Sequence, residues 1–248
     1  MKESEYLRMA EQEKHYWWHR GRLEIIDTYL RQVVTSGPIR MLNVGCGTGS
    51  TVAMLEKYGD VDNIDISEHA VSLMRRCGHS RVSRTDGVSL PYGDNSFDVV
   101  CAFDVLEHIQ DDVEALAEWS RVLKSDGAIV LTVPAYQWLW SGHDLALHHF
   151  RRYTRKTLRR VALAAGLGTD RTSYAIVFSL PILVSVRLIQ NIIKPTAGPV
   201  SSYVDVPRSV NWMFTRLLYL EARFHPYLAF PAGSSVVAIL RRTEDGIR

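Results

Sequence analysis

Three glycines, Gly45, Gly47 and Gly49, stand between a short apolar segment (39–44) and a helical pattern. Glycine lets the backbone approach a ligand closely, and the first turn of a helix leaves N–H groups free to bind it. Asp65 ends the next apolar segment, twenty positions after Gly45. A carboxylate there can accept hydrogen bonds from both hydroxyls of a ribose. The pattern predicts a site for a nucleoside-containing ligand; the alternative is a tight turn followed by a helix cap.

Two further acidic residues follow predicted strands. Asp86 comes after the segment 81–85, and Asp104 comes after 97–103. Ligands of open α/β sheets bind at the carboxyl ends of the strands, so these side chains are expected to converge with Gly45 and Asp65. Asp86 is placed to accept a hydrogen bond from a purine amino group, and its alternative role is that of a turn-forming residue.

The elements that position these residues alternate between strand and helix. This order predicts an α/β fold, a Rossmann-like, doubly wound sheet of seven mostly parallel strands. Strands are expected at 39–44, 61–66, 81–85, 97–103, 127–133, 173–178 and 235–240, and helices at 3–34, 50–58, 68–77, 111–123 and 157–165. Prolines break the pattern between 179 and 232. The chain thus divides into an N-terminal helical extension or lid (1–37), a core (38–178), a helical insertion (179–232), and the last strand with a tail (233–248).

Composition excludes several classes of protein. The 248 residues are 46% hydrophobic and 23% charged, which is typical of a globular protein and not of a disordered, coiled-coil or collagen-like chain. Three cysteines without metal-site spacing indicate reduced thiols, and the charged N-terminus does not resemble a signal peptide. Residues 1–149 hold 14 basic and 22 acidic residues, a net charge of −8, whereas residues 150–248 hold 15 and 5, a net charge of +10.

Residues 38–135 resemble a class I S-adenosylmethionine-dependent methyltransferase with a type 11 methyltransferase domain. The resemblance rests on MLNVGCGTG (41–49), VDNIDIS (61–67), RTDGVSLPYGDNSFDVV (84–100), FDVLEHIQD (103–111) and RVLKSDGAIVLTVPA (121–135). It implies S-adenosyl-L-methionine as the cofactor. The implied cofactor-binding residues are Gly45, Cys46, Gly47 and Gly49 at the methionyl part, Asp65 at the ribose, Ile66, Asp86 and Gly87 at the adenine, and Phe103 and Asp104 at the methionyl end.

Two positions depart from the family pattern. Asn43 stands where these enzymes usually have an acidic residue, so the charge that would attract the cofactor's ammonium group is missing or is supplied by Asp104. Asn63 replaces the glycine that usually precedes the acidic end of the second strand. The resemblance also places His108 near the site of methyl transfer.

Methyl transfer needs mainly alignment of acceptor, methyl group and sulfur, and a base only for acceptors that lose a proton. The base candidates are His108, His149 and Tyr153. Candidate substrate-binding residues are Trp18 and Arg22 in the N-terminal extension and Arg151 and Arg152, whose guanidinium groups suit an anionic acceptor. A metal site of His143, Asp144 and His148 is the alternative for this segment, as is a plain polar loop; we predict no metal.

The acceptor is expected to be small or lipid-linked. The apolar insertion next to basic residues has three alternative roles: a substrate lid, a homodimer interface, or peripheral contact with a membrane. The segment 174–193 has the length of a membrane span but contains Arg187, which disfavours one. Nucleic acid is disfavoured because no recognition motif is present. The expected location is cytoplasmic, with or without contact at the inner face of the membrane. Rival functions are a non-catalytic S-adenosylmethionine-binding regulatory protein and a nucleotide-dependent oxidoreductase.

Overall fold

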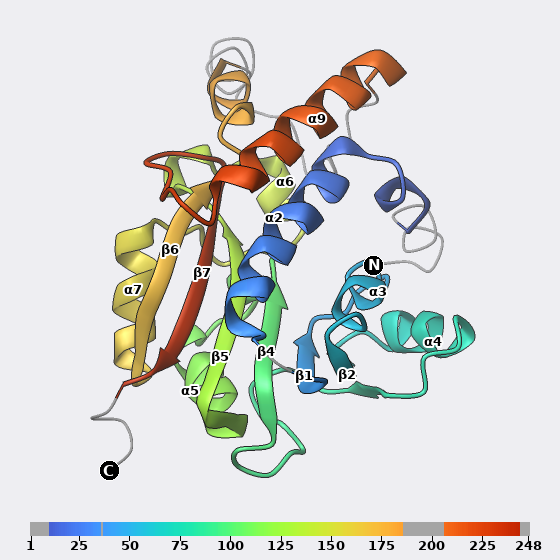
Figure 1. Cartoon of the computed structure of the whole chain (residues 1–248), viewed down its shortest axis with the longest axis vertical. Coiled ribbons are helices and arrows are strands. Elements are labelled where there is room, and N and C mark those ends of the chain that lie inside the picture. The colour runs from blue at the N-terminus through green and yellow to red at the C-terminus, as the bar shows by residue number, and fades with distance from the viewer. Residues whose placement is uncertain (1–9, 36, 186–205, 244–248) are drawn as a thin grey trace.

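A computed structural model of the chain describes residues 10–35, 37–185 and 206–243. Its centre is a seven-stranded sheet with the order β3-β2-β1-β4-β5-β7-β6 (Figure 1). Neighbouring strands from β3 to β5 run parallel, and β7 is antiparallel to both β5 and β6. The strands are β1 (Ile39–Val44), β2 (Gly59–Asp65), β3 (Val82–Arg84), β4 (Phe97–Phe103), β5 (Leu123–Pro134), β6 (Leu167–Ala175) and β7 (Ser235–Arg242). The predicted fold class is therefore confirmed.

Helices cover both faces of this sheet (Figure 1). On one face, α2 (Trp17–Val33) and α9 (Arg208–Phe224) share a core with the inward side chains of β1, β4, β5 and β7. On the other face, α5 (Asp112–Val122) and α7 (Arg155–Ala164) share a second core that includes the fully buried Trp119. Two shorter helices, α3 (Val52–Leu55) and α4 (Glu68–Arg76), follow β1 and β2. This layering leaves the carboxyl ends of the parallel strands free to carry a site.

Several predicted boundaries shift. The helix expected at 50–58 is helical only at Val52–Leu55, and the one expected at 3–34 is interrupted at 14–16; its first residues lie outside the described ranges. Strand β6 begins at Leu167, six residues before the expected start, and runs antiparallel beside β7 at the sheet edge. The first half of β6 is polar, which is possible because an edge strand can face water. A hydrophobicity pattern therefore does not detect it.

The C-terminal part of the predicted insertion packs on the N-terminal extension. Helices α2 and α9 lie side by side (Figure 1), and Gly21 allows the close approach of Leu218. Asn211 accepts a hydrogen bond from the Trp17 amide and donates one to the His15 carbonyl, both at 2.8 Å. Residues 186–205 of the predicted insertion, including Arg187, lie outside the described ranges. Among the described helices, none combines the length and apolar character needed to cross a membrane.

Candidate functional site

The glycine loop after β1 is held by Asp65 at the end of β2. Gly45 and Gly47 have φ values of 70° and 53°, a region that favours glycine. One carboxylate oxygen of Asp65 accepts from the Gly47 amide and the other from the Ser67 amide, each at 2.8 Å. Burial raises the pKa of Asp65, and these two amides oppose the shift. The loop and the carboxylate therefore come together as predicted, and the carboxylate keeps acceptor sites for ribose hydroxyls.

The residues predicted to lie at the adenine differ in their surroundings. Ile66 follows Asp65 with its side chain 66% exposed, so an apolar surface lies beside the carboxylate. Asp86 is exposed and one of its oxygens accepts from the amides of Ser89 and Val88, which lower its pKa. This is the turn-forming role that the sequence left open for Asp86. The carbonyl of Gly87 accepts from the Trp119 indole at 2.8 Å.

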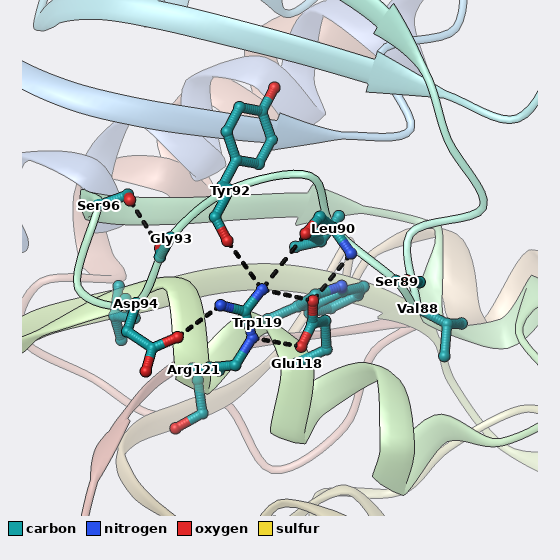
Figure 2. A network of polar contacts seen from close by, with 12 residues as sticks. Val88, Ser89, Leu90, Tyr92, Gly93, Asp94, Ser96, Glu118, Trp119 and Arg121 are labelled. Atoms are coloured by element: carbon teal, nitrogen blue, oxygen red, sulfur yellow. Dashed lines mark hydrogen bonds and ion pairs between the residues drawn. The ribbon is translucent and has the colours of Figure 1, made fainter.

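A network centred on Arg121 fixes the loop between Asp86 and β4 (Figure 2). The Arg121 guanidinium forms ion pairs with Glu118 and Asp94 and donates to the carbonyls of Leu90 and Tyr92. Glu118 in turn accepts from the Leu90 amide at 2.8 Å. Because the loop is tied to α5 at several points, Asp86 and Gly87 have a fixed position at the end of the sheet.

The two departures from the family pattern are in direct contact. The Asn43 amide donates to Asn63 Oδ1 at 2.9 Å, and both side chains are buried. Asn63 also donates to the carbonyls of Val61 and Arg81. The pair thus fills the space between the ends of β1 and β2 with a neutral hydrogen-bonded unit.

A charged pair links α2 to the end of β4. Arg22 forms an ion pair with Asp104, and its guanidinium also lies over the Trp18 ring, 4.7 Å from the centroid. Asp104 adopts a φ of 57° and accepts from the Thr132 hydroxyl at 3.2 Å. Phe103 beside it is buried. Three predicted residues, Trp18, Arg22 and Asp104, therefore meet at one place, and the charge of Asp104 is shared with Arg22.

Glu13 is a site residue that the sequence did not reveal. This buried carboxylate accepts a hydrogen bond from Thr48 in the glycine loop, and His19 Nδ1 lies 3.9 Å from it. Burial raises the pKa of Glu13, whereas burial lowers the pKa of His19 to about 3. The N-terminal segment therefore lies directly against the glycine loop. Its charged composition gave no periodic signal that would indicate such a contact.

A second group of predicted residues lies just beyond Asp104. His108 ends the short helix η1 (Leu106–His108), and its ring lies 4.6 Å from that of His149, which follows α6 (Gly142–Ala146). Burial and the neighbouring His149 lower the pKa of His108 to about 4, although part of its surface is exposed. His149 Nδ1 lies 2.9 Å from Asp144 Oδ1.

Arg151 and Arg152, two of the predicted substrate-binding residues, have internal partners. Arg152 binds the fully buried Asp144 through two nitrogens, at 2.7 and 3.0 Å, and Arg151 pairs with Asp112 at 2.8 Å. Burial alone would raise the pKa of Asp144, but its bonds to His149 and Arg152 outweigh that effect and lower it. Asp144 is thus engaged with Arg152 and His149, which disfavours the alternative metal site with His143 and His148.

Tyr153 does not join the histidines. Its side chain is buried in the core, its hydroxyl donates to Asp112 at 2.8 Å, and burial raises its pKa. These are the contacts of a core residue, and they remove the basis for expecting Tyr153 to accept a proton from a substrate.

The residues at the strand ends fit the groups of S-adenosylmethionine. The glycine loop leaves open space where Gly47 would carry a Cβ, Asp65 retains acceptor capacity, and Ile66 offers an apolar surface. Arg22 and Asp104 supply one positive and one negative group, which match a carboxylate and an ammonium. Cys46 is buried and burial raises its pKa to about 12, so it is a neutral loop residue.

Comparison with known proteins supports S-adenosylmethionine as the cofactor. Residues 42–131 match the family model described as methyltransferase domain. A Mycobacterium tuberculosis protein, named as a probable S-adenosylmethionine-dependent methyltransferase, is 27% identical over 62% of this chain and 56% of its own length. The demethylmenaquinone methyltransferase of Staphylococcus aureus is 32% identical over 42% of this chain and 48% of its own. The chain thus spans about half the length of these curated relatives.

Solved structures share the fold at low identity. A Haloferax volcanii methyltransferase, in complex with its Trm112 activator, has a TM-score of 0.63 at 16% identity and covers 97% of this chain and 95% of its own. The [4+2]-cyclase SpnF has a TM-score of 0.55 at 22% identity, over 88% of this chain and 80% of its own. The chain therefore has the fold of these solved structures, and residues 42–131 match the methyltransferase domain family model.

Proposed function

We propose that this protein transfers a methyl group from S-adenosylmethionine to a small or lipid-linked acceptor that carries an anionic group. The observation that carries the proposal is the convergence of the Asp65-bound glycine loop with the Arg22–Asp104 ion pair at one end of the sheet. The glycine loop with Asp65 would bind the nucleoside half of the cofactor. The Arg22–Asp104 pair would bind its amino-acid half.

The cofactor supplies an electrophilic methyl group on a positively charged sulfur. The chain's own residues bind and orient it: Asp65 accepts from the ribose hydroxyls, and Ile66 packs against the adenine. Arg22 donates to the carboxylate of the methionyl end, and Asp104 accepts from its ammonium group. Both residues give up part of their contact with each other. Trp18 stacks on Arg22 and restricts water at this end, which strengthens the charged contacts.

The acceptor side is best assigned to the histidine pair. His149 is the stronger base candidate because Asp144, 2.9 Å from its Nδ1, orients the ring, as the carboxylate of a His–Asp pair does. Arg151 suits an anionic group better than Arg152, since 30% of its side chain is exposed against 10% for Arg152. His108 lies between these groups and the Asp104 end of the site.

A lipid-linked acceptor is supported by one surface feature. Helix α9 exposes Met213, Leu217, Leu220 and Phe224, which recur at helical spacing along one side. Arg208, Arg216 and Arg223 lie on the same helix. An apolar stripe with arginines is typical of peripheral contact with an anionic membrane. We propose this contact together with the lipid-linked acceptor, and a cytoplasmic location that would allow it.

A transfer assay tests the proposal. The protein is incubated with methyl-labelled S-adenosylmethionine and a panel of anionic glycolipids, quinols and small carboxylates. We expect label in one acceptor class and an equal amount of S-adenosylhomocysteine, both lost in Asp65→Ala. Cofactor binding without label in any acceptor would contradict the proposal and favour a non-catalytic regulatory protein.

A further inference from the structure

Three potential metal ligands from two separate segments meet beyond the end of β4. Glu107 and His108 belong to η1, and His149 follows α6. One ligand atom from each lies within 4.8 Å of the other two. In a tetrahedral site with bonds of about 2.0–2.2 Å, two ligand atoms lie about 3.3–3.6 Å apart. Side-chain movements of about 1 Å would therefore bring all three onto one ion.

Glu107 is the unusual member of this group. Its side chain has no exposed surface, and neither carboxylate oxygen has a hydrogen-bond partner among the described residues. Burying a carboxyl group without a partner costs free energy, and buried carboxylates are normally paired or bound to a metal. Glu107 has no hydrogen-bond partner among the described residues, which leaves a bound metal ion as the compensating group.

His149 is oriented as a metal ligand would be. Its Nδ1 faces Asp144, which Arg152 also contacts through two nitrogens. A carboxylate at Nδ1 favours the tautomer with hydrogen on that nitrogen and leaves the Nε2 lone pair free. Carboxylate–histidine–metal arrangements of this kind are the usual surroundings of a metal-binding histidine. Asp144 would thus be a positioning residue.

We propose that Glu107, His108 and His149 bind one divalent transition-metal ion, with Zn²⁺ as the preferred ion. Two imidazoles and one carboxylate are a zinc-binding set, and three protein ligands leave a coordination position open. This site departs from our prediction of no metal and uses different residues from the His143, Asp144 and His148 alternative.

A metal ion at this site would favour acceptors that carry a hydroxyl group. This step rests on the proposed methyl transfer. With a metal bound, His149 would be a ligand and no longer the base: a metal-bound hydroxyl has a lowered pKa, so the acceptor would bind as its oxyanion and release its proton to solvent. The oxygen then forms a bond to the methyl carbon while the carbon–sulfur bond breaks, and that electron pair stays on sulfur. The acceptor class would be an alcohol or phenol, methylated on oxygen.

Zinc binding tests the site without cofactor or acceptor. Untagged full-length protein carrying Cys77→Ser, which removes an exposed thiol, is stripped with a chelator and dialysed against Zn²⁺. Bound zinc is counted by mass spectrometry, and affinity is measured by competition with a chromophoric chelator. We expect one zinc per chain, and at least a tenfold loss of affinity in each of Glu107→Gln, His108→Gln and His149→Gln.

The matched control is His79→Gln. His79 Nδ1 lies 3.3 Å from Glu56, so it is another histidine next to a carboxylate, but outside the cluster. Its replacement should leave the zinc count and affinity unchanged. His108 is exposed, so His108→Gln tests the site even where a buried replacement unfolds the chain. Absence of tight zinc in the parent protein, or equal affinity in all variants, would overturn the site. Retained S-adenosylmethionine binding in that case would leave the proposed function standing.

Discussion

Asn43 on β1 donates a buried hydrogen bond to Asn63 on β2, at 2.9 Å. An aspartate at 43 would bring a carboxylate against the Asn63 oxygen and remove the donor. We expect Asn43→Asp to lower the free energy of unfolding by about 1–3 kcal/mol, the usual effect of an unsatisfied buried polar group. Denaturant titration of purified protein measures it.

The double variant Asn43→Asp with Asn63→Gly supplies the comparison. Glycine at 63 removes the opposing oxygen, so the loss of stability should be smaller than the sum of the two single losses. The added charge should also strengthen cofactor binding. Additive losses with unchanged affinity would show that the two residues are not coupled.

The Arg22–Asp104 ion pair gives a prediction for binding. Asp104→Asn keeps the shape of the side chain but removes the charge offered to the cofactor's ammonium. We expect at least a tenfold weaker affinity for S-adenosylmethionine, about 1.4 kcal/mol, by calorimetry. Asp170→Asn is the matched control, because Asp170 also pairs with an arginine but has a 54% exposed side chain and lies on the edge strand β6, outside the site. Equal affinities of the two variants would contradict the assigned role.

The close packing of α2 on α9 predicts the effect of a single methyl group. A Cβ at Gly21 would lie 2.1 Å from Leu218 Cδ1 and 2.4 Å from its Cβ. Gly21→Ala should therefore destabilise the protein by about 1–3 kcal/mol through overpacking. Leu218→Ala should lower the free energy of unfolding by less in the Gly21→Ala variant than in the parent protein. Gly93→Ala, whose new Cβ would meet Ser96 Oγ at 3.7 Å, is the control expected to change stability little.

His19 predicts a loss of stability in mild acid. Burial lowers its folded-state pKa to about 3, below the unfolded value near 6.5. As the pH falls through 6.5, the unfolded chain takes up the proton first, so the stability that His19 contributes above pH 6.5 is progressively lost down to about pH 3. At pH 5 the loss is about 2 kcal/mol.

Urea unfolding of His19→Gln and parent protein at pH 7 and pH 5 measures this contribution. The variant should lose less stability between the two pH values. Glu13 has the opposite shift, raised by burial, but is present in both proteins and cancels in the comparison to first order. An identical pH dependence of the two proteins would contradict the assignment.

The sequence predicted the elements that carry strong hydrophobic patterns. Strands β1 and β4 begin and end where expected, because each is an apolar run bounded by turn residues. The glycine loop and Asp65 were also predictable, since their chemistry depends on neighbours close in the sequence. In contrast, β6 was misplaced at its start because its polar residues at the sheet edge interrupt the pattern.

Contacts between segments far apart in the sequence could not be predicted from it. Glu13 meets Thr48 and Arg22 meets Asp104 only because the segment before α2 and the first turns of α2 lie at the strand ends. The sequence suggested Arg22 as a substrate-binding residue but could not show that Asp104 is its internal partner. Likewise, no functional role for Glu107 was predicted from the sequence, and only its buried, unpartnered side chain next to His149 indicates one.

The most direct test of the central claim is calorimetric titration with S-adenosylmethionine and S-adenosylhomocysteine, with NAD as a control ligand. It compares the parent protein, Asp65→Ala, and Asp60→Ala, which changes an exposed carboxylate near the other end of β2. We predict micromolar binding of both methionine derivatives to the parent and to Asp60→Ala, a large loss in Asp65→Ala, and no binding of NAD. Absence of binding to the parent, or equal binding by both variants, would contradict the cofactor site described above.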